Sequence, residues 1–248
     1  MPISKKIFLT GASRGIGAVV ALELARRGNT VGCLSRRGTG PEGLDIPSDL
    51  QERLVLLKGD VTDTRSIGAA LEAFHARSGP IDGIVNNAGV HVESPSDSQP
   101  LSEFEEILRT NAVATFAVCQ LAFPYLKATG NGLIVNMGSF FEKLGVRRNT
   151  AYCASKAAVH AITRCLAVEW ASKGIRVMTV APGYVETDLN KDFLASEKIR
   201  AFLAARIPVG GPAKADDVAR LVASLFQEDI PFLTGEAIYL DGGQGMAH

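Results

Sequence analysis

The chain of 248 residues lacks the features that mark several classes of protein. Neither charge sign is in excess, since 26 Lys and Arg balance 26 Asp and Glu, so no global field attracts nucleic acid or an anionic membrane. The four cysteines form no Cys-x-x-Cys pair, and each lies in an apolar segment: Cys33, Cys119, Cys153 and Cys165. This pattern predicts buried thiols in a reducing compartment rather than a disulfide framework or a metal site.

A membrane-spanning segment is also missing. The most apolar long stretch, 112–126, is interrupted by polar residues and Pro124 and is shorter than the roughly 20 residues that cross a bilayer. The N-terminus, Met1 to Lys6, runs into a strand pattern without a signal-peptide hydrophobic region or cleavage site. The sequence therefore predicts a soluble cytoplasmic protein with no membrane or nucleic-acid partner.

Short apolar runs alternate with longer amphipathic ones along the whole chain. The short runs lack polar alternation, which is typical of parallel strands buried on both faces. Strand patterns lie at 7–10, 30–34, 54–57, 83–86, 133–136, 176–180 and 237–240, and helix patterns near 15–28, 62–78, 102–126, 150–173 and 215–227. The alternation predicts one α/β domain over 1–248: a Rossmann-type doubly wound parallel sheet of about seven strands with helices on both faces. Segment 186–210 is expected to form short helical pieces of a substrate loop or lid.

A glycine-rich turn, Thr10 to Gly17, follows the first predicted strand and opens the first helix. Glycines there permit a tight turn, let backbone approach a pyrophosphate, and offer helix N-terminal amides to its charge. The turn also matches the Gly-x-Ser-x-Gly elbow of serine hydrolases around Ser13. A hydrolase is disfavoured because His91 is the only histidine expected on a suitable loop, and no acid is evident to orient it. The turn predicts a nucleotide phosphate site.

The end of the second predicted strand, Ser35-Arg36-Arg37, lacks the acidic residue that receives the 2′-hydroxyl of NAD. Arginine suits a 2′-phosphate through its charge and forked donors. Arg14, inside the glycine turn, could reach the same phosphate. These residues predict NADP(H) rather than NAD(H).

Tyr152 and Lys156 stand four residues apart at the start of a helix pattern, so they share one face. A cation beside the phenol would lower its pKa from about 10 and make Tyr152 a proton donor and acceptor near neutral pH. Alone, this spacing usually means a core aromatic beside a solvated amine. Its importance comes from the motifs that accompany it.

With these residues, the chain resembles the short-chain dehydrogenase/reductase family, most closely its 3-oxoacyl-(acyl-carrier-protein) reductase-like branch. The resemblance covers nearly all of the chain and depends on several motifs in register. These are the glycine turn, Asp60-Val61, Asn86-Asn87-Ala88-Gly89, the ordered set Asn111, Ser139, Tyr152 and Lys156, the loop Pro182-Gly183-Tyr184-Val185-Glu186-Thr187, and Leu240-Asp241-Gly242-Gly243.

The resemblance implies an oxidoreductase, such as a carbonyl reductase, that transfers hydride between nicotinamide and a carbonyl or secondary alcohol. Tyr152 would exchange the proton, Lys156 would lower its pKa and bind the nicotinamide ribose, and Ser139 would hold the carbonyl. Asn111 would bend its helix and hold a water that relays protons from Lys156. The implied cofactor-binding residues are Gly11, Ser13, Arg14, Gly15, Ile16, Gly17, Ser35, Arg36, Arg37, Asp60, Val61, Asn87, Ala88, Gly89, Tyr152, Lys156, Pro182, Gly183, Val185 and Thr187.

The substrate is expected to meet the segments 91–100, 140–149 and 184–210, where Phe140, Val146 and Leu189 add apolar surface. A hydrophobic ketone or 3-oxoacyl compound therefore fits better than a sugar, and its predicted contacts are Ser139, Phe141, Tyr152 and Tyr184. A carrier-bound thioester is in doubt because the turn 129–132 lacks the arginine often seen in that branch. The alternatives are an NAD(H)-dependent alcohol or sugar dehydrogenase of the same family and a non-catalytic nucleotide sensor.

The helix patterns 102–126 and 150–173 are apolar over more than one face. One sheet cannot cover both apolar stripes of each helix, so the helices are expected to pair across a subunit interface. The sequence thus predicts a homotetramer or homodimer.

Overall fold

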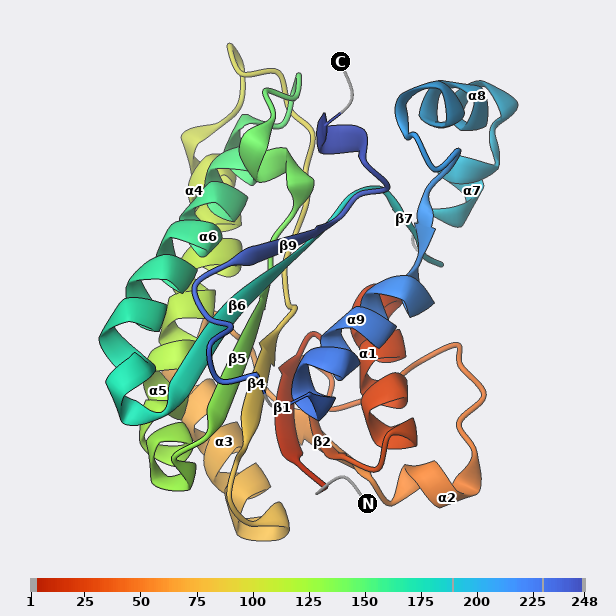
Figure 1. Cartoon of the computed structure of the whole chain (residues 1–248). Helices are drawn as coiled ribbons and strands as arrows, with labels where there is room; N and C mark the ends of the chain where they lie inside the picture. The colour runs from red at the N-terminus through yellow and green to blue at the C-terminus, as the bar shows by residue number, and fades with distance from the viewer. Residues whose placement is uncertain (1–3, 189, 229, 247–248) are drawn as a thin grey trace.

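The computed structural model describes residues 4–188, 190–228 and 230–246. A seven-stranded parallel sheet forms its centre (Figure 1), with the strand order β3-β2-β1-β4-β5-β6-β9. The strands are β1 (Lys6–Thr10), β2 (Thr30–Ser35), β3 (Leu54–Lys58), β4 (Gly83–Asn86), β5 (Gly132–Met137), β6 (Ile175–Pro182) and β9 (Ala237–Leu240). The predicted Rossmann-type α/β domain is confirmed, and the strand order reverses between β1 and β4.

Helices cover both faces of the sheet (Figure 1). One face carries α1 (Gly15–Arg26) and α9 (Ala215–Gln227), and its core includes Leu9, Val85 and Val180. The other face carries α3 (Thr64–Ser78), α5 (Ala114–Thr129) and α6 (Thr150–Trp170), packed over Phe8 and Ile84. The continuous apolar runs of the sequence are explained by this burial, because successive side chains of each central strand enter opposite cores.

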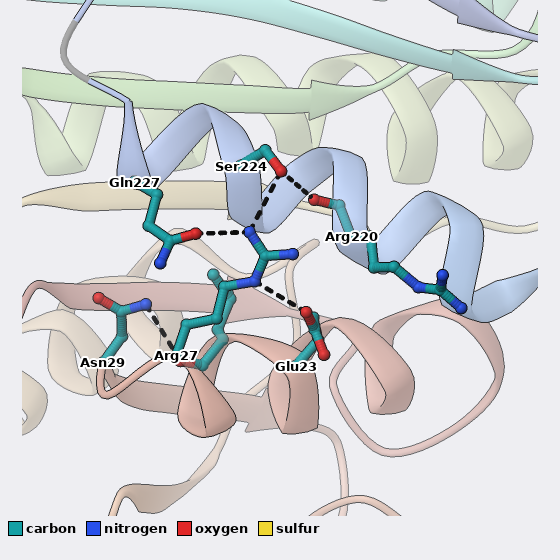
Figure 2. Close-up of polar contacts among 7 residues, drawn as sticks. Glu23, Arg27, Asn29, Arg220, Ser224 and Gln227 are labelled. Carbon is teal, nitrogen blue, oxygen red and sulfur yellow. Dashed lines mark hydrogen bonds and ion pairs between the residues drawn. The ribbon is translucent and has the colours of Figure 1, made fainter.

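Arg27 joins the two helices of the first face (Figure 2). It directly follows α1, and its Nε lies 2.8 Å from Oε1 of Glu23. Its Nη1 donates to α9 at Ser224 Oγ (3.1 Å) and Gln227 Oε1 (2.6 Å). These charge-assisted contacts join the C-terminal end of α1 to α9.

The predicted helix over 102–126 consists of three pieces. The first is α4 (Leu101–Leu108), a single turn of π-helix follows (η1, Arg109–Val113), and α5 completes the run. Isolated π turns interrupt α-helices mostly at functional sites. Asn111 lies inside this turn.

The segment 186–210 forms short helices, as predicted: α7 (Lys191–Ala195) and α8 (Glu197–Arg206). Its two ends are joined by a short parallel ladder between β7 (Val185–Glu186) and β8 (Ala213–Lys214). Its interior is a small separate cluster of Leu194, Leu203 and Ile207, against which Tyr184 packs. The segment projects beyond the carboxyl ends of the strands (Figure 1). Leu189, an expected apolar contact, lies outside the described residues.

The remaining elements are short: α2 (Ser48–Gln51), the 3-10 turns η2 (Phe140–Lys143) and η3 (Ala171–Lys173), and η4 (Gln244–Met246). Within the part of the chain that the structure describes, no helix combines the length and apolar composition needed to cross a bilayer.

Candidate active site

The candidate site lies at the carboxyl edge of the sheet, where the strand order reverses. In a parallel sheet all strands end at the same edge, and a ligand crevice forms outside the point of reversal. The loops that meet there follow β1, β4, β5 and β6, and they carry the predicted glycine turn, Asn87 to Gly89, Ser139 and the 182–187 loop.

The glycine turn has the close approaches that its sequence predicts. Gly11 and Gly15 have positive φ angles of 68° and 55°, which favour glycine. A Cβ on Gly11 would lie 2.8 Å from Ala88 Cα, and one on Gly17 would lie 2.1 Å from the Gly11 carbonyl oxygen. The Asn87 amide donates to the carbonyls of Thr10 (3.2 Å) and Gly11 (3.0 Å), so the loop after β4 braces the turn.

These residues fit a dinucleotide. Arg14 precedes α1 with extended backbone, and among the described residues no side chain caps the first amides of the helix. Uncapped amides at a helix N-terminus suit a pyrophosphate. Gly11 and Gly17 leave the space that a Cβ would fill, so backbone can approach the phosphates closely.

The predicted 2′-phosphate residues divide into two kinds. The Arg37 guanidinium contacts both carboxylate oxygens of Glu42, at 2.5 and 2.6 Å. Arg36 is exposed, and its charge adds to the hydrogen bonds from Thr62 that hold the pKa of the Asp60 carboxyl below its usual range. The Arg36 charge therefore acts on Asp60, the predicted adenine contact, whereas Arg37 is paired within its own loop.

Other predicted cofactor residues have local roles as well. The Ser35 hydroxyl donates to the Thr39 carbonyl at 2.8 Å and accepts from the Thr39 amide at 3.0 Å, closing the turn after β2. Ile16 and Val61 pack at the edges of the two cores. Pro182 ends β6, Gly183 follows it, and Val185 begins β7. The Thr187 amide donates to Asn190 Oδ1 at 2.8 Å, and the Asn190 amide donates to the Val185 carbonyl at 2.9 Å, so Asn190 ties this segment together.

Tyr152 and Lys156 lie on one face of α6, as their spacing predicts. The Lys156 Nζ is 5.6 Å from the centroid of the Tyr152 ring and donates a 2.8 Å hydrogen bond to the Met137 carbonyl at the end of β5. Lys156 is only 6% exposed. Lys156 therefore contacts the last residue of β5, two residues before Ser139.

The predicted lowering of the Tyr152 pKa is wrong for this structure. Burial raises the pKa of Tyr152 to about 12, although a hydrogen bond from Ser139 opposes the rise. Burial also lowers the pKa of Lys156 from 10.5 to about 8, against the attraction of Glu142. Removal from water disfavours the charged form of each group, and it is the largest cause of both pKa shifts.

Ser139 and Asn111 border the same pair of residues. Ser139 is buried, and its hydroxyl accepts a 3.3 Å hydrogen bond from the Phe141 amide, which caps η2. The Asn111 amide group donates to Ser155 Oγ at 3.0 Å, one residue before Lys156. The π turn is consistent with the predicted bend at Asn111, and the proton-relaying water stays a prediction.

Aromatic rings form a wall around the Tyr152 phenol. Phe141 lies edge-on to Tyr152 with 6.0 Å between ring centroids and to Tyr184 at 6.1 Å. Phe140 lies 5.6 Å from Tyr184. The four predicted substrate contacts therefore share one apolar region.

Sequence reasoning missed the contact between His91 and Tyr152, because it placed His91 only at the start of the expected substrate segment 91–100 and as a hydrolase partner. The His91 ring centroid lies 4.6 Å from that of Tyr152, and its Nε2 contacts Oδ1 of Asn149. The Asn149 amide in turn donates to the Arg147 carbonyl at 2.9 Å. The available signal was the position of His91, two residues beyond the Asn-Asn-Ala-Gly motif. Across the described residues, no cluster of His, Cys, Asp and Glu could hold a metal ion.

Comparison with known proteins agrees with this geometry. A family model described as enoyl-(acyl carrier protein) reductase matches residues 11–244. The 3-oxoacyl-(acyl-carrier-protein) reductase FabG of Escherichia coli (strain K12) is 32% identical over 242 residues, 98% of each chain. The chain belongs to the short-chain dehydrogenase/reductase family. It is an enzyme of this family, acting on CH–OH or C=O groups.

Two further proteins show the breadth of this family. The 3beta-hydroxysteroid dehydrogenase 1 of Eggerthella lenta is 32% identical over 244 residues, 96% of this chain and 93% of the relative. The crystal structure of a gluconate 5-dehydrogenase from Burkholderia cenocepacia J2315, in complex with NADP and tartrate, superposes with a TM-score of 0.87 at 27% identity. That match covers 100% of this chain and 98% of the other. These relatives act on different substrates, so family membership alone leaves the substrate of this short-chain dehydrogenase/reductase open.

Proposed function

We propose that this enzyme is an NADP(H)-dependent reductase of a hydrophobic ketone or a 3-oxoacyl compound. The observation that carries the proposal is the position of the Tyr152 phenol, which lies beside Ser139 and Lys156 and against the rings of Phe141 and His91. A proton donor in an apolar wall suits a carbonyl with apolar substituents better than a polyhydroxylated substrate.

Each polar side chain has a task that its surroundings support. Tyr152 stays protonated at neutral pH because burial raises its pKa to about 12, and the protonated phenol is the form that can give a proton to a carbonyl oxygen. The Ser139 hydroxyl can donate to the same oxygen and orient it. Lys156 carries the nearby positive charge that favours the phenolate once the proton has left. A bound nicotinamide supplies the hydride.

The choice of NADP(H) depends on Arg36 and Arg14. Arg36 is an exposed cation directly after β2, where a 2′-phosphate would lie, and no acidic residue occupies positions 35–37. The gluconate 5-dehydrogenase with a similar fold binds NADP, which agrees with this choice.

Two observations support acyl substrates: the chain is 32% identical to a 3-oxoacyl-(acyl-carrier-protein) reductase, and an apolar wall surrounds Tyr152. A free ketone satisfies the same geometry. An acyl-carrier-protein thioester is therefore one member of the substrate class rather than its definition.

The test is NADPH oxidation, followed by absorbance, against simple ketones, β-ketoesters, acetoacetyl thioesters and sugar-derived ketones. We expect turnover of apolar ketones or acetoacetyl compounds, with kcat/KM for NADPH well above that for NADH. Equal kcat/KM for the two cofactors would reject the cofactor assignment. Turnover confined to sugars would favour the sugar dehydrogenase alternative, and the absence of turnover despite NADPH binding would favour a nucleotide sensor.

A further inference from the structure

A buried carboxylate lies behind the catalytic pair and has no part in the proposed chemistry. Glu142 is three residues after Ser139, in η2, and its amide donates to the Ser139 carbonyl at 3.0 Å. Its side chain is only 2% exposed. An ionised group so far removed from water requires partners that compensate the loss of solvation.

One oxygen of this carboxylate has two partners and the other has none. The Tyr239 hydroxyl donates to Oε1 from β9, and the His160 Nδ1 lies 2.7 Å from the same oxygen, from α6. Oε2 is buried and, among the described residues, makes no hydrogen bond. It lies 3.3 Å from the position that a Cβ on Gly138 would take. The glycine thus leaves room for the carboxylate against the end of β5.

Lys156 reaches the same point of the chain from its own helix. Its ammonium donates to the carbonyl of Met137, the residue before Gly138, at 2.8 Å. The carboxylate and the ammonium therefore approach the Met137–Gly138 segment, and the attraction of Glu142 raises the pKa of Lys156 against the larger effect of burial. Opposite charges in a water-poor region stabilise each other even without direct contact.

We propose that Glu142 is a positioning residue that keeps Lys156 charged at the pH where the enzyme works. Without the carboxylate, Lys156 would lose its proton more readily in its buried setting, and with it the charge beside Tyr152. His160 and Tyr239 hold Oε1 in place, whereas Oε2 makes no hydrogen bond among the described residues. The approach of Glu142 and Lys156 to the Met137–Gly138 segment does not depend on the proposed function, and only the catalytic consequence of the charge does.

Other charged and titratable groups face this cluster and enter its titration. The Lys143 ammonium lies 3.5 Å from the centroid of the Tyr239 ring. Arg164 and Asp241 act on the Tyr239 phenol with opposite sign. Burial, followed by the Glu142 carboxylate, raises the Tyr239 pKa well above its usual value, so Tyr239 remains a donor to Glu142 throughout the neutral range.

The direct test is a titration of Lys156 by NMR in the intact protein labelled at lysine side chains, with Lys156→Met identifying the resonance. We expect the wild-type resonance to titrate near pH 8. Glu142→Gln should move that midpoint down by roughly one pH unit, whereas Glu142→Asp should retain most of the wild-type value. Tyr239→Phe is the matched control, because it removes a hydrogen bond to Glu142 and leaves the charge. Glu142→Ser is a second neutral variant in case the glutamine protein does not fold.

The outcomes separate this inference from the proposed function. An unchanged Lys156 midpoint in either folded neutral variant overturns the inference, as does an equal shift in Tyr239→Phe. If the NMR shift is found, the alkaline limb of kcat/KM for ketone reduction should move by the same amount in Glu142→Gln. A shifted NMR midpoint in a protein that reduces no ketone would sustain the electrostatic role and reject the proposed function instead.

Discussion

Asn111 and Val90 exchange two hydrogen bonds. The Val90 amide donates to Asn111 Oδ1 at 2.8 Å, and the Asn111 amide group donates to the Val90 carbonyl at 2.9 Å. Because Asn111 also donates to Ser155, its side chain joins the loop after β4 to α6. The residue thus fixes two walls of the crevice relative to each other, so any water relay would have to share an amide that already has these structural partners.

Tyr152→Phe should abolish turnover while NADPH binding remains. The substitution removes the proton donor and keeps the ring that packs against Phe141 and His91. General acid catalysis typically contributes about 100-fold to 10,000-fold, so kcat should fall by about 100-fold or more. Steady-state kinetics and NADPH fluorescence titration measure the two properties. Tyr125→Phe, on α5 and away from the site, is the control. Wild-type kcat in Tyr152→Phe would remove Tyr152 as the donor.

Most of the fold was predictable because parallel strands buried on both faces leave a continuous apolar pattern. The predicted strand positions lie within the seven observed strands or overlap them. The π turn at Arg109–Val113 was not predictable from periodicity, since a single widened turn shifts the apolar stripe without interrupting it.

The site was predictable where one short motif carries its chemistry, as in Tyr152 and Lys156. It was not predictable where residues far apart in sequence meet, as Glu142, His160 and Tyr239 do. The direction of the Tyr152 pKa shift was wrong for a related reason. Spacing shows that a cation is near, but the cost of burial depends on the whole surrounding structure.

Arg36→Ser should weaken NADPH more than Arg37→Ser does. Arg36 is an exposed cation at the end of β2, whereas Arg37 already contacts both oxygens of Glu42. Loss of one charge-assisted contact of about 1.4 kcal/mol would raise the KM for NADPH about tenfold and leave the KM for NADH nearly unchanged. The KM values of both variants with both cofactors test this. A larger effect from Arg37→Ser would mean that Arg37 leaves Glu42 to bind the phosphate.

Lys156 should make the stability of the protein rise with pH in the alkaline range. Its folded-state pKa is about 8, below the ordinary 10.5, so between these values the unfolded chain holds one more proton than the folded one. Stability therefore increases by about 1.4 kcal/mol per pH unit in this window and is independent of this group below it. The free energy of unfolding of the wild type minus that of Lys156→Met should rise by about 2 kcal/mol from pH 8 to pH 10.

Lys127→Met is the matched control for that titration, since Lys127 is an exposed residue near the end of α5. The rise for Lys156→Met should exceed any change for Lys127→Met over the same pH range. A flat difference for Lys156→Met would show that Lys156 keeps an ordinary pKa in the folded protein.

The outer faces of α5 and α6 should form a subunit interface. Val168 on α6 is 82% exposed, and Phe116 on α5 and Val113 in the preceding π turn are exposed too. Apolar side chains on adjacent helices gain free energy when a second copy covers them, and the two helices run side by side on one flank of the molecule (Figure 1). Light scattering at micromolar concentration should therefore give a dimer or tetramer.

Val168→Asp should dissociate this assembly, because association would bury an unpaired charge. Phe232→Asp, at a fully exposed residue outside these helices, should leave the assembly intact. A monomeric wild type, or dissociation by Phe232→Asp alone, would contradict this interface.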